Sequence, residues 1–543
     1  MKAAVRRTGG LAVGGLATLV LTARPPDRPT AQSARWRPEE RVLLSDFSYV
    51  EAVAASPFTL FVATPHGLTI YDRQARAWRL PVTSLDGYPA ARVRVALADA
   101  VENAVWLGTD QGWARYDGTI HTWDLGPVAG GVSNFVLDAR DPATGIFVQG
   151  GAGWGFLSRG SLIPIPGRPL PPPSQRIQPL DPRTALAQTP MADAMRALIL
   201  TDPRLRSYRF TAAARSPDQS DLFLGTDGMG VVRLDPATGQ WETLAFGLLA
   251  ARAGAVAAGP GGVWVASAGR AGQRHGLTWV AADLAADTAI AGPGALGFGC
   301  VEGRRLLVRG GSLWLACERG VVKIDARTYR SRLFEVENPQ SLAPAPDGVW
   351  VGSARGLTVV TGGDKVVPVG RPGQPVLSLV AVRESVWVGT PGGLGVLAPG
   401  ATDLAVPPDV AAEPALSAPI LALALVRDTL VALTAEQFAW RGPPNSPGPP
   451  PAARRWTLVR ARAELGRVTA LAADGGSEPG DGGVWIGGTN GLAFWNLARG
   501  TFRTLQVPLD LPAAVRDVAV DPSYLWVATD SGLVRLARAA ALR

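Results

Sequence analysis

The stretch VWVGTPGGLGVL, from Val386 to Leu397, contains a structural unit that this chain repeats along most of its length. It holds a run of β-forming residues around a tryptophan, a small polar turn that ends in glycine, and a second β-forming run. Together these features predict a β-hairpin. Close variants recur: VWLGTDQGWARYD from Val105, LFLGTDGMGVVRLD from Leu222, VWVGSARGLTVV from Val349, VWIGGTNGLAFWN from Val484 and LWVATDSGLVRLA from Leu525.

Many units also have an alternating apolar stretch upstream, such as VRVALADA from Val93, and a short aromatic strand downstream, such as TFRTL from Thr501. Four short strands per unit are the sequence signature of an all-β fold, the β-propeller. Because propellers usually have about four to eight blades, the number of units favours two rings. Alignment on the tryptophan position gives eleven units, most of them 36 to 54 residues apart: Phe61, Trp106, Phe147, Phe223, Trp264, Trp314, Trp350, Trp387, Val431, Trp485 and Trp526.

The repeated tryptophan has a structural explanation in this fold. On a middle strand its ring fills the gap between neighbouring blades, and the glycine after it permits the left-handed backbone of a tight turn. We therefore expect a structural role and burial for the tryptophans of the units: Trp106, Trp264, Trp314, Trp350, Trp387, Trp485 and Trp526.

The spacing of the units also predicts the domain organisation. We expect a signal peptide at 1–34, blades 1 to 3 at 35–165 and blades 4 to 11 at 208–543. Residues 166–207 form a Pro-rich and partly helical insertion, with a short helix over 184–200, and 441–455 form an exposed Pro-rich loop. Because the last unit lacks its outermost strand, the amino-terminal segment should pair with it and close the ring.

The repeated phrase resembles the two-component regulator propeller repeat, found in periplasmic sensor regions of bacteria. The resemblance covers most of residues 58–543 and is strongest in the units at Trp106, Phe223, Trp387, Trp485 and Trp526. It implies a propeller used for ligand sensing or protein contacts outside the inner membrane. In the best-known members of this family a transmembrane helix, a histidine kinase or a DNA-binding domain is expected after the last repeat. This sequence shows none of them there, so a signalling role is left open.

The amino terminus predicts export. Lys2, Arg6 and Arg7 precede LAVGGLATLVLTA, residues 11–23, which suits a signal-peptide core but is shorter than the roughly 20 residues that span a bilayer. The paired arginines leave the twin-arginine route open beside ordinary secretion. We expect a periplasmic or secreted protein that starts between residues 24 and 36 and has no stable transmembrane anchor.

The charge of the chain bears on the class of its partner, and its cysteines bear on a possible disulfide. The net charge is +8, and arginines spread along the chain without a basic run argue against nucleic-acid binding. In an oxidising compartment Cys300 and Cys317 permit one disulfide, which would close a loop worth about 3 kcal/mol. Two buried free thiols are an equal alternative.

Motifs of catalysis are scarce in this sequence. Three scattered histidines, and no HExxH, CxxC or Asp-rich calcium loop, predict neither a metal site nor a cofactor. The recurring turn aspartates Asp110, Asp227 and Asp530 are typical of hairpin turns. A non-catalytic binding module is therefore the leading hypothesis, with an unknown envelope protein, an anionic ligand or a glycan as partner. The alternative is a propeller enzyme of the lyase or glycosidase type, whose site is assembled from loops of several blades.

One cationic sector is the candidate binding site. Turns between the second and third strands of units five to seven should lie on one face and bring several cations together. Arginine offers planar donors to carboxylates and phosphates, so this sector would attract an anionic partner. The alternative is ordinary solvated arginine, with Glu318 neutralising part of the charge. The residues of this cationic sector are Arg270, Arg274, His275, Arg319 and Arg355.

Overall fold

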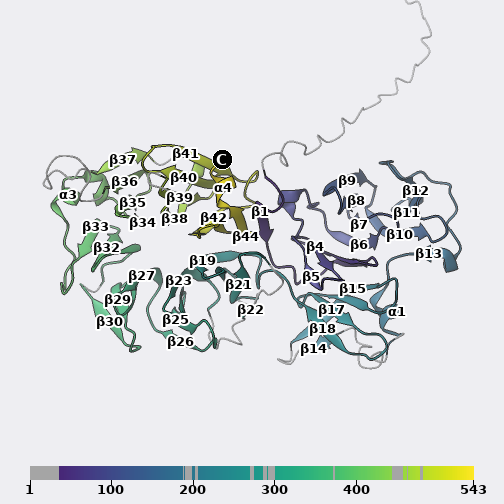
Figure 1. The fold of residues 1–543 in the computed structure, drawn as a ribbon, viewed down its shortest axis with the longest axis horizontal. Coiled ribbons are helices and arrows are strands. Elements are labelled where there is room, and N and C mark those ends of the chain that lie inside the picture. The colour runs from purple at the N-terminus through teal and green to yellow at the C-terminus, as the bar shows by residue number, and fades with distance from the viewer. Residues whose placement is uncertain are drawn as a thin grey trace, which may run out of the picture.

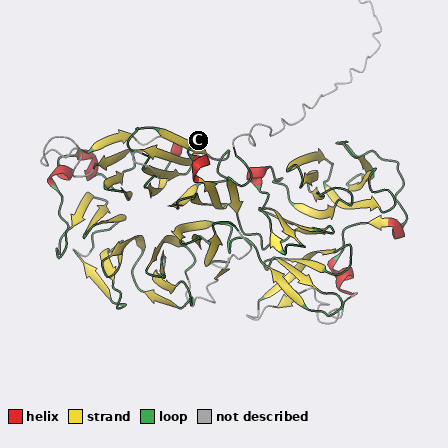
Figure 2. Cartoon of the chain, viewed as in Figure 1, coloured by secondary structure: helices red, strands yellow, loops and turns green. Residues whose placement is uncertain are grey.

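In the computed structural model the described chain is almost entirely β (Figure 2). Eleven antiparallel sheets within the described residues confirm the β-propeller, and they form two rings that lie side by side (Figure 1). The expected signal peptide and residues 443–455 of the Pro-rich loop lie outside the described part. The structure describes residues 36–187, 189, 199–201, 206–269, 274–284, 290–291, 300–370, 373–442, 456–460, 463–476 and 481–543.

The small ring contains blades 1 to 4. Its first, innermost strands lie side by side, β2 beside both β6 and β15, and β6 beside β10. The strands are β2 (Ala52–Ala55), β3 (Thr59–Thr64), β4 (Gly67–Asp72) and β5 (Ala77–Trp78) in blade 1; β6 (Val93–Ala98), β7 (Ala104–Thr109), β8 (Gly112–Asp117) and β9 (Thr122–Pro127) in blade 2; β10 (Val132–Asp138), β11 (Gly145–Gly150) and β12 (Gly153–Ser158) in blade 3; and β15 (Ser207–Arg215), β16 (Leu222–Thr226), β17 (Val231–Leu234) and β18 (Trp241–Leu244) in blade 4.

The large ring contains blades 5 to 11 and closes where β42 lies beside β19. Its strands are β19 (Ala253–Gly259), β20 (Gly262–Ser267), β21 (Leu277–Ala281) and β22 (Ile290–Ala291) in blade 5; β23 (Gly303–Arg309), β24 (Ser312–Cys317), β25 (Gly320–Asp325) and β26 (Ser331–Phe334) in blade 6; β27 (Pro339–Ala345), β28 (Gly348–Ser353), β29 (Gly356–Val360) and β30 (Val366–Val369) in blade 7; β31 (Ser378–Val382), β32 (Ser385–Thr390) and β33 (Gly393–Leu397) in blade 8; β34 (Ala422–Val426), β35 (Thr429–Leu433), β36 (Gln437–Arg441) and β37 (Thr457–Arg460) in blade 9; β38 (Val468–Asp474), β39 (Gly483–Gly488), β40 (Gly491–Asn496) and β41 (Phe502–Gln506) in blade 10; and β42 (Val515–Val520), β43 (Tyr524–Thr529) and β44 (Gly532–Ala537) in blade 11.

The amino-terminal segment completes the last blade, as the sequence predicted. Strand β1 (Arg41–Leu44) pairs antiparallel with β44, with Arg41 opposite Leu536 and Leu44 opposite Leu533. All four residues of β1 are buried. The edge of blade 11 is thereby covered rather than left free to pair with another chain.

The small ring is an insertion into the large ring. After β1 the chain leaves blade 11, builds blades 1 to 4 and returns to begin blade 5. The outgoing and returning segments pair where they cross, because Asp46 and Gly247 form a bridge and the Leu248 amide donates to the Ser45 carbonyl oxygen at 2.8 Å. The eleven units therefore divide into four and seven, a division that the linear order of the repeats hides.

The segment between blades 3 and 4 contributes to the small ring. Strand β13 (Arg176–Ile177) pairs with the end of β10, and Leu180 forms a bridge with Ala213 of β15. Helix α1 (Pro182–Ala187) packs on β15, after the short η2 turn (Pro173–Gln175). The helix expected over 184–200 is wrong at its end, because β14 (Ile199–Thr201) pairs with β15 and buries Leu200. Tertiary strand pairing overrides the local helix pattern there.

Short helices lie in several connections between the other strands and after the last strand. They are η1 (Ser84–Asp86), α3 (Pro408–Ala411), η3 (Pro414–Ser417), η5 (Ala463–Leu465) and α4 (Arg538–Ala541). The turn glycine of the opening phrase, Gly393, has φ = 117°, and a Cβ there would lie 2.4 Å from the Leu416 carbonyl oxygen. Only glycine fits this turn without strain.

The unit tryptophans pack between blades. Trp485 shares a core cluster with Val527 of the next blade, and Trp526 shares one with Val265 across the closure of the large ring. Trp350 is half-buried against blade 8. The other six are at most 6% exposed: Trp106, Trp264, Trp314, Trp387, Trp485 and Trp526.

A recurrent clasp of aspartate and arginine ties neighbouring blades together. The aspartate lies at the end of the first strand of one blade or in the turn that follows it, and the arginine follows the third strand of the neighbouring blade. In two clasps the aspartate also accepts from the unit tryptophan, and a third closes the small ring between blades 4 and 1. The pairs are Asp99 with Arg159, Asp474 with Arg538, and Asp221 with Arg73.

Candidate functional site

Arg274 of the predicted cationic sector lies at the joint between the rings. Its Nη1 atom donates to the Gly228 carbonyl oxygen at 2.8 Å and lies 3.6 Å from a carboxylate oxygen of Asp46. His275 beside it is half-buried, and Arg270 lies outside the described residues. Arg274 of blade 5 thus contacts blade 4 of the small ring and the segment that leads from β1 into this ring.

The other two residues of the cationic sector lie on blades 6 and 7. Arg319 and Arg355 are both exposed, in the turns between the second and third strands. Arg355 forms an ion pair with Glu337, whereas Glu318 accepts from the backbone amides of Val301 and Glu302 at 2.7 and 3.0 Å. Capture of an anionic partner by this sector stays a prediction.

The two cysteines form a disulfide in the large ring. Cys300 and Cys317 are both buried, and their Cα atoms lie 5.8 Å apart. They belong to the core shared by blades 5 and 6. The bond therefore fixes the connection between these blades to strand β24.

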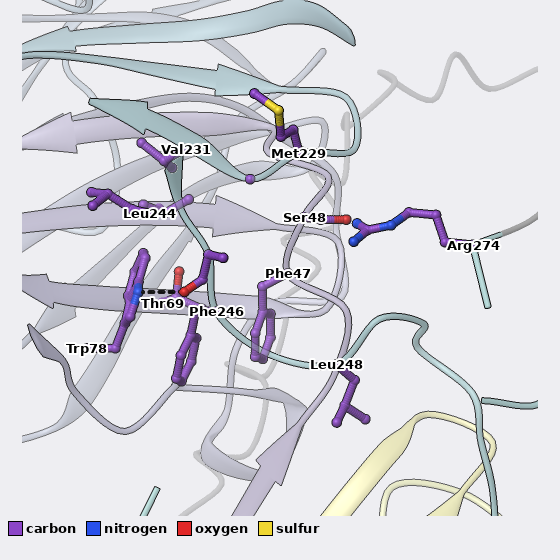
Figure 3. A pocket seen from close by; sticks show the side chains of 13 residues that line it. Phe47, Ser48, Thr69, Trp78, Met229, Val231, Leu244, Phe246, Leu248 and Arg274 are labelled. Carbon is purple, nitrogen blue, oxygen red and sulfur yellow. Dashed lines mark hydrogen bonds between the residues drawn. The ribbon is translucent and has the colours of Figure 1, made fainter. Parts of the chain in front are cut away.

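A small apolar pocket lies at the joint of the rings (Figure 3). The Phe246 ring stacks on Phe47 and Trp78, with centroids 5.8 and 5.1 Å apart. The Trp78 indole N–H also donates to the Ala245 carbonyl oxygen at 3.1 Å. The stacked rings pack the returning segment against blade 1, so we interpret this region as a structural joint.

A larger cavity of about 500 Å³ lies within the small ring. It is lined by the carboxyl-terminal ends of β2, β6 and β15, by the turns that follow these strands, and by residues 177–180. Alanines line its inner part, and exposed Pro57, Ala100 and Pro217 form part of its rim. Its volume lies within the range of about 300 to 1,000 Å³ that ligand pockets typically occupy.

Within the described residues, blades 3 and 4 share no core cluster. Every other pair of neighbouring blades shares one, whereas blade 4 packs on Ala185 and Leu186 of helix α1. Residues 176–180 connect the first strands of the two blades, because β13 pairs with β10 and Leu180 forms a bridge with Ala213 of β15. The cavity lies beside this segment, at the ends of β2, β6 and β15.

Two charged side chains line the cavity, and they differ in their partners. The carboxylate of Asp99 is fully buried, and both of its oxygens accept hydrogen bonds. They accept from the Trp106 indole at 3.0 Å and from both terminal nitrogens of Arg159 at 2.9 and 3.1 Å. Arg215, at the end of β15, makes no hydrogen bond or ion pair with the described residues. Among the described residues of the lining, Arg215 is therefore the charged side chain that has no charged partner.

Sequence reasoning missed this site. Its signal is the run of small residues at the end of the first strand of blades 1, 2 and 4, in AVAAS, VALADA and TAAARS. Similar alanines occur in the large ring, for example VAAG at Val256, so the pattern alone does not locate a cavity. The cavity forms where the ends of β2, β6 and β15 meet residues 177–180, segments that are far apart in the sequence.

Half-buried Asp517 of β42 lies beside the first strand of blade 5 in the large ring. The Val256 amide of β19 donates to an Asp517 carboxylate oxygen of β42 at 3.1 Å. Burial raises the pKa of Asp517, and Arg305 opposes this shift only in part.

Replacement of this carboxyl group should change how stability depends on pH. A raised folded-state pKa means that Asp517 keeps its proton in the native protein after the unfolded chain has lost it, so the contribution of Asp517 to stability falls as pH rises above about 3.9. Asp517→Asn removes this loss. We expect the melting temperature of Asp517→Asn, relative to wild type, to increase from about pH 4 toward neutrality.

Asp235→Asn is the control, because its effect on the melting temperature should depend on pH in the opposite direction. The side chain of Thr238 and the backbone amides of Ala237 and Thr238 lower the pKa of Asp235. Ionised Asp235 therefore stabilises the folded protein above about pH 3.9, and this stabilisation is lost as the pH falls through the lower folded-state pKa. A pH-independent difference between Asp517→Asn and wild type would contradict the assignment of Asp517 as a carboxyl group with a raised pKa.

Neither a metal cluster nor a membrane-spanning helix occurs in the described part of the chain. No group of three or more His, Cys, Asp or Glu side chains there could hold a metal ion. No described helix is long and apolar enough to cross a bilayer.

Comparisons with known proteins support the fold. The chain matches PorZ of Porphyromonas gingivalis, an essential bacterial surface component of the type-IX secretion system, with a TM-score of 0.53 and 9% identity. The match covers 92% of this chain and 87% of PorZ. The chain is a double β-propeller. At this identity the likeness to PorZ shows the fold alone.

Two matches are extracellular domains of putative hybrid two-component systems of B. thetaiotaomicron. BT3049 has a TM-score of 0.41 and 14% identity, covering 89% of this chain, which spans 61% of that domain. BT4673 has a TM-score of 0.41 and 12% identity, covering 90% of this chain and 70% of that one. At these scores the two matches carry no argument about function. No family model and no curated protein matches the chain.

Proposed function

We propose that this chain is an exported, non-catalytic binding propeller of the cell envelope that takes a small molecule into the cavity of its small ring. The observation that carries the proposal is the cavity itself. Its wall combines the first strands of three blades with residues 177–180, so four parts of the chain meet one ligand. A pocket that is mainly apolar with a few convergent polar groups is typical of small-molecule sites.

Three further observations support export and binding outside the cytoplasm. The charged start and short apolar stretch of the sequence are typical of a signal peptide. The disulfide between Cys300 and Cys317 is typical of an oxidising compartment. The fold is also that of PorZ, described as a bacterial surface component.

A cavity-filling variant tests the proposal. Ala55 lines the cavity at the end of β2, so Ala55→Phe should fill it. Ala473 is the matched control, because Ala55 and Ala473 both lie opposite the residue that precedes the aromatic of their unit. We would screen a library of small apolar molecules by ligand-observed NMR against wild type and both variants.

Several library members should bind wild type and Ala473→Phe but not Ala55→Phe. Melting temperatures close to wild type would show that both variants fold. If wild type binds no member, or if Ala55→Phe binds the same members as wild type, the cavity is not a ligand site and the proposal fails.

A further inference from the structure

The register of the repeats singles out Arg215. It ends β15 opposite Leu222, the residue before the aromatic of its unit. In nine other blades the equivalent position holds an apolar residue, so a charge at this place is peculiar to blade 4. The nine residues are Ala55, Ala98, Ala258, Val308, Pro344, Ala381, Leu425, Ala473 and Val520.

The guanidinium of Arg215 is held without an acceptor. Its Nε and Nη2 atoms are shielded from solvent and make no hydrogen bond with any described residue. A shielded donor without a partner destabilises the protein, and a charged donor does so more strongly. An acceptor in the cavity would meet the half-buried guanidinium at Nη1, which is not among its shielded atoms, and a carboxylate there would form a charge-assisted hydrogen bond.

The cavity offers no free carboxylate among its described lining residues that could pair with a positive charge on the ligand. Asp99 is neutralised by Arg159 and accepts from the Trp106 indole, so it is not available to a ligand cation. No other carboxylate lines the described wall of the cavity. A zwitterion or a cation would therefore lose the hydration of its ammonium group without gaining an anionic partner.

Most of the cavity is apolar. Its lining consists largely of Ala, Val, Leu, Ile and Pro, with Ser56 and Gln178 as the uncharged polar side chains. A hydrocarbon body gains free energy here by leaving water. A sugar would leave most of its hydroxyl groups without partners.

From these observations we infer that the ligand of the small-ring cavity is a small monocarboxylate with an apolar body, and that Arg215 binds its carboxylate. This inference rests on the proposed function, since it names the ligand class of the same cavity. The body lies against the alanines of β2, β6 and β15, and the carboxylate lies at the end of β15.

A matched series of probes tests the charge. Phenylpropionate, phenylpropanol, phenylpropylamine and phenylalanine have similar carbon skeletons and differ in their polar groups. We would titrate each into the full chain by calorimetry. Phenylpropionate should bind at least about tenfold tighter than the other three, the effect of one charge-assisted hydrogen bond.

Three arginine variants test the residue. Arg215→Met keeps the length of the side chain and should remove the preference for the acid, whereas Arg215→Lys should keep part of it. The control is Arg209→Met, because Arg209 is exposed on the same strand and lies outside the lining of the cavity. It should bind as wild type does. Arg215→Lys also keeps the test decisive if Arg215→Met does not fold.

The outcomes separate this inference from the proposed function. If phenylpropanol or phenylalanine binds wild type as tightly as phenylpropionate, the monocarboxylate inference is overturned while the cavity remains a ligand site. An unchanged preference in Arg215→Met overturns the role of Arg215. If no probe binds, the ligand class is wrong, and the library screen with Ala55→Phe decides the proposed function on its own.

Discussion

A chain that starts at residue 46 is expected to be far less stable than one that starts at residue 36. The shorter chain lacks β1, in which Val42, Leu43 and Leu44 are each 3% exposed. Burial of a Val or Leu side chain contributes about 1.5 to 3 kcal/mol, so the three together contribute about 5 to 9 kcal/mol. The free edge of β44 should also promote aggregation. Urea unfolding of the two chains measures the difference.

A peptide of residues 36–45 should restore the missing strand in trans. Added in excess, it would pair with β44 and raise the urea midpoint of the shorter chain by mass action. The same peptide with Leu43→Asp is the control, because it places a charge in the core shared by blades 10 and 11. Equal urea midpoints for the two chains would show that β1 contributes nothing to blade 11.

The second large effect is expected for Asp474→Ala, which breaks the clasp between blades 10 and 11. The Asp474 side chain is 1% exposed and accepts from the Trp485 indole and from Arg538 Nε, both at 2.9 Å. Its removal leaves a buried guanidinium and an indole N–H without an acceptor. Loss of one partner of a buried ion pair costs about 3 to 5 kcal/mol. The free energy of unfolding in urea reports this cost.

Asp481→Ala is the matched control for this clasp. Asp481 lies in the same blade and pairs with Arg499 at 2.9 Å, but the two side chains are 36% and 69% exposed. An exposed pair contributes about 1 kcal/mol or less. Equal losses in the two variants would contradict the structural role of the clasp.

Local sequence was sufficient for the blades and their aromatic residues. The phrase around Trp387 encodes a hairpin by strand propensity and by a turn that only glycine fits at Gly393. Because each blade meets only its neighbours, this local pattern also predicts that the unit tryptophans fill the gaps between blades. The short last unit likewise predicted that β1 completes blade 11.

The candidate site could not be predicted in the same way. The structure places Arg274 of the cationic sector at the joint between the rings and pairs Arg355 with Glu337, and binding by this sector stays a prediction. Arg215 drew no attention in the sequence, because arginines are spread along the chain and its neighbours read as an ordinary strand end. Its position became distinctive only after strand pairing aligned it with the apolar residues of other blades.

The sequence by itself determined that this chain is a propeller of eleven units with a shared terminal blade, since strand propensity, turn chemistry and repeat spacing act over short distances. Only the tertiary structure decided that four blades form a small ring inserted between β1 and blade 5. Ring closure depends on contacts between residues far apart in sequence, such as Arg73 with Asp221. The cavity follows from that closure, which brings the ends of β2, β6 and β15 together with residues 177–180.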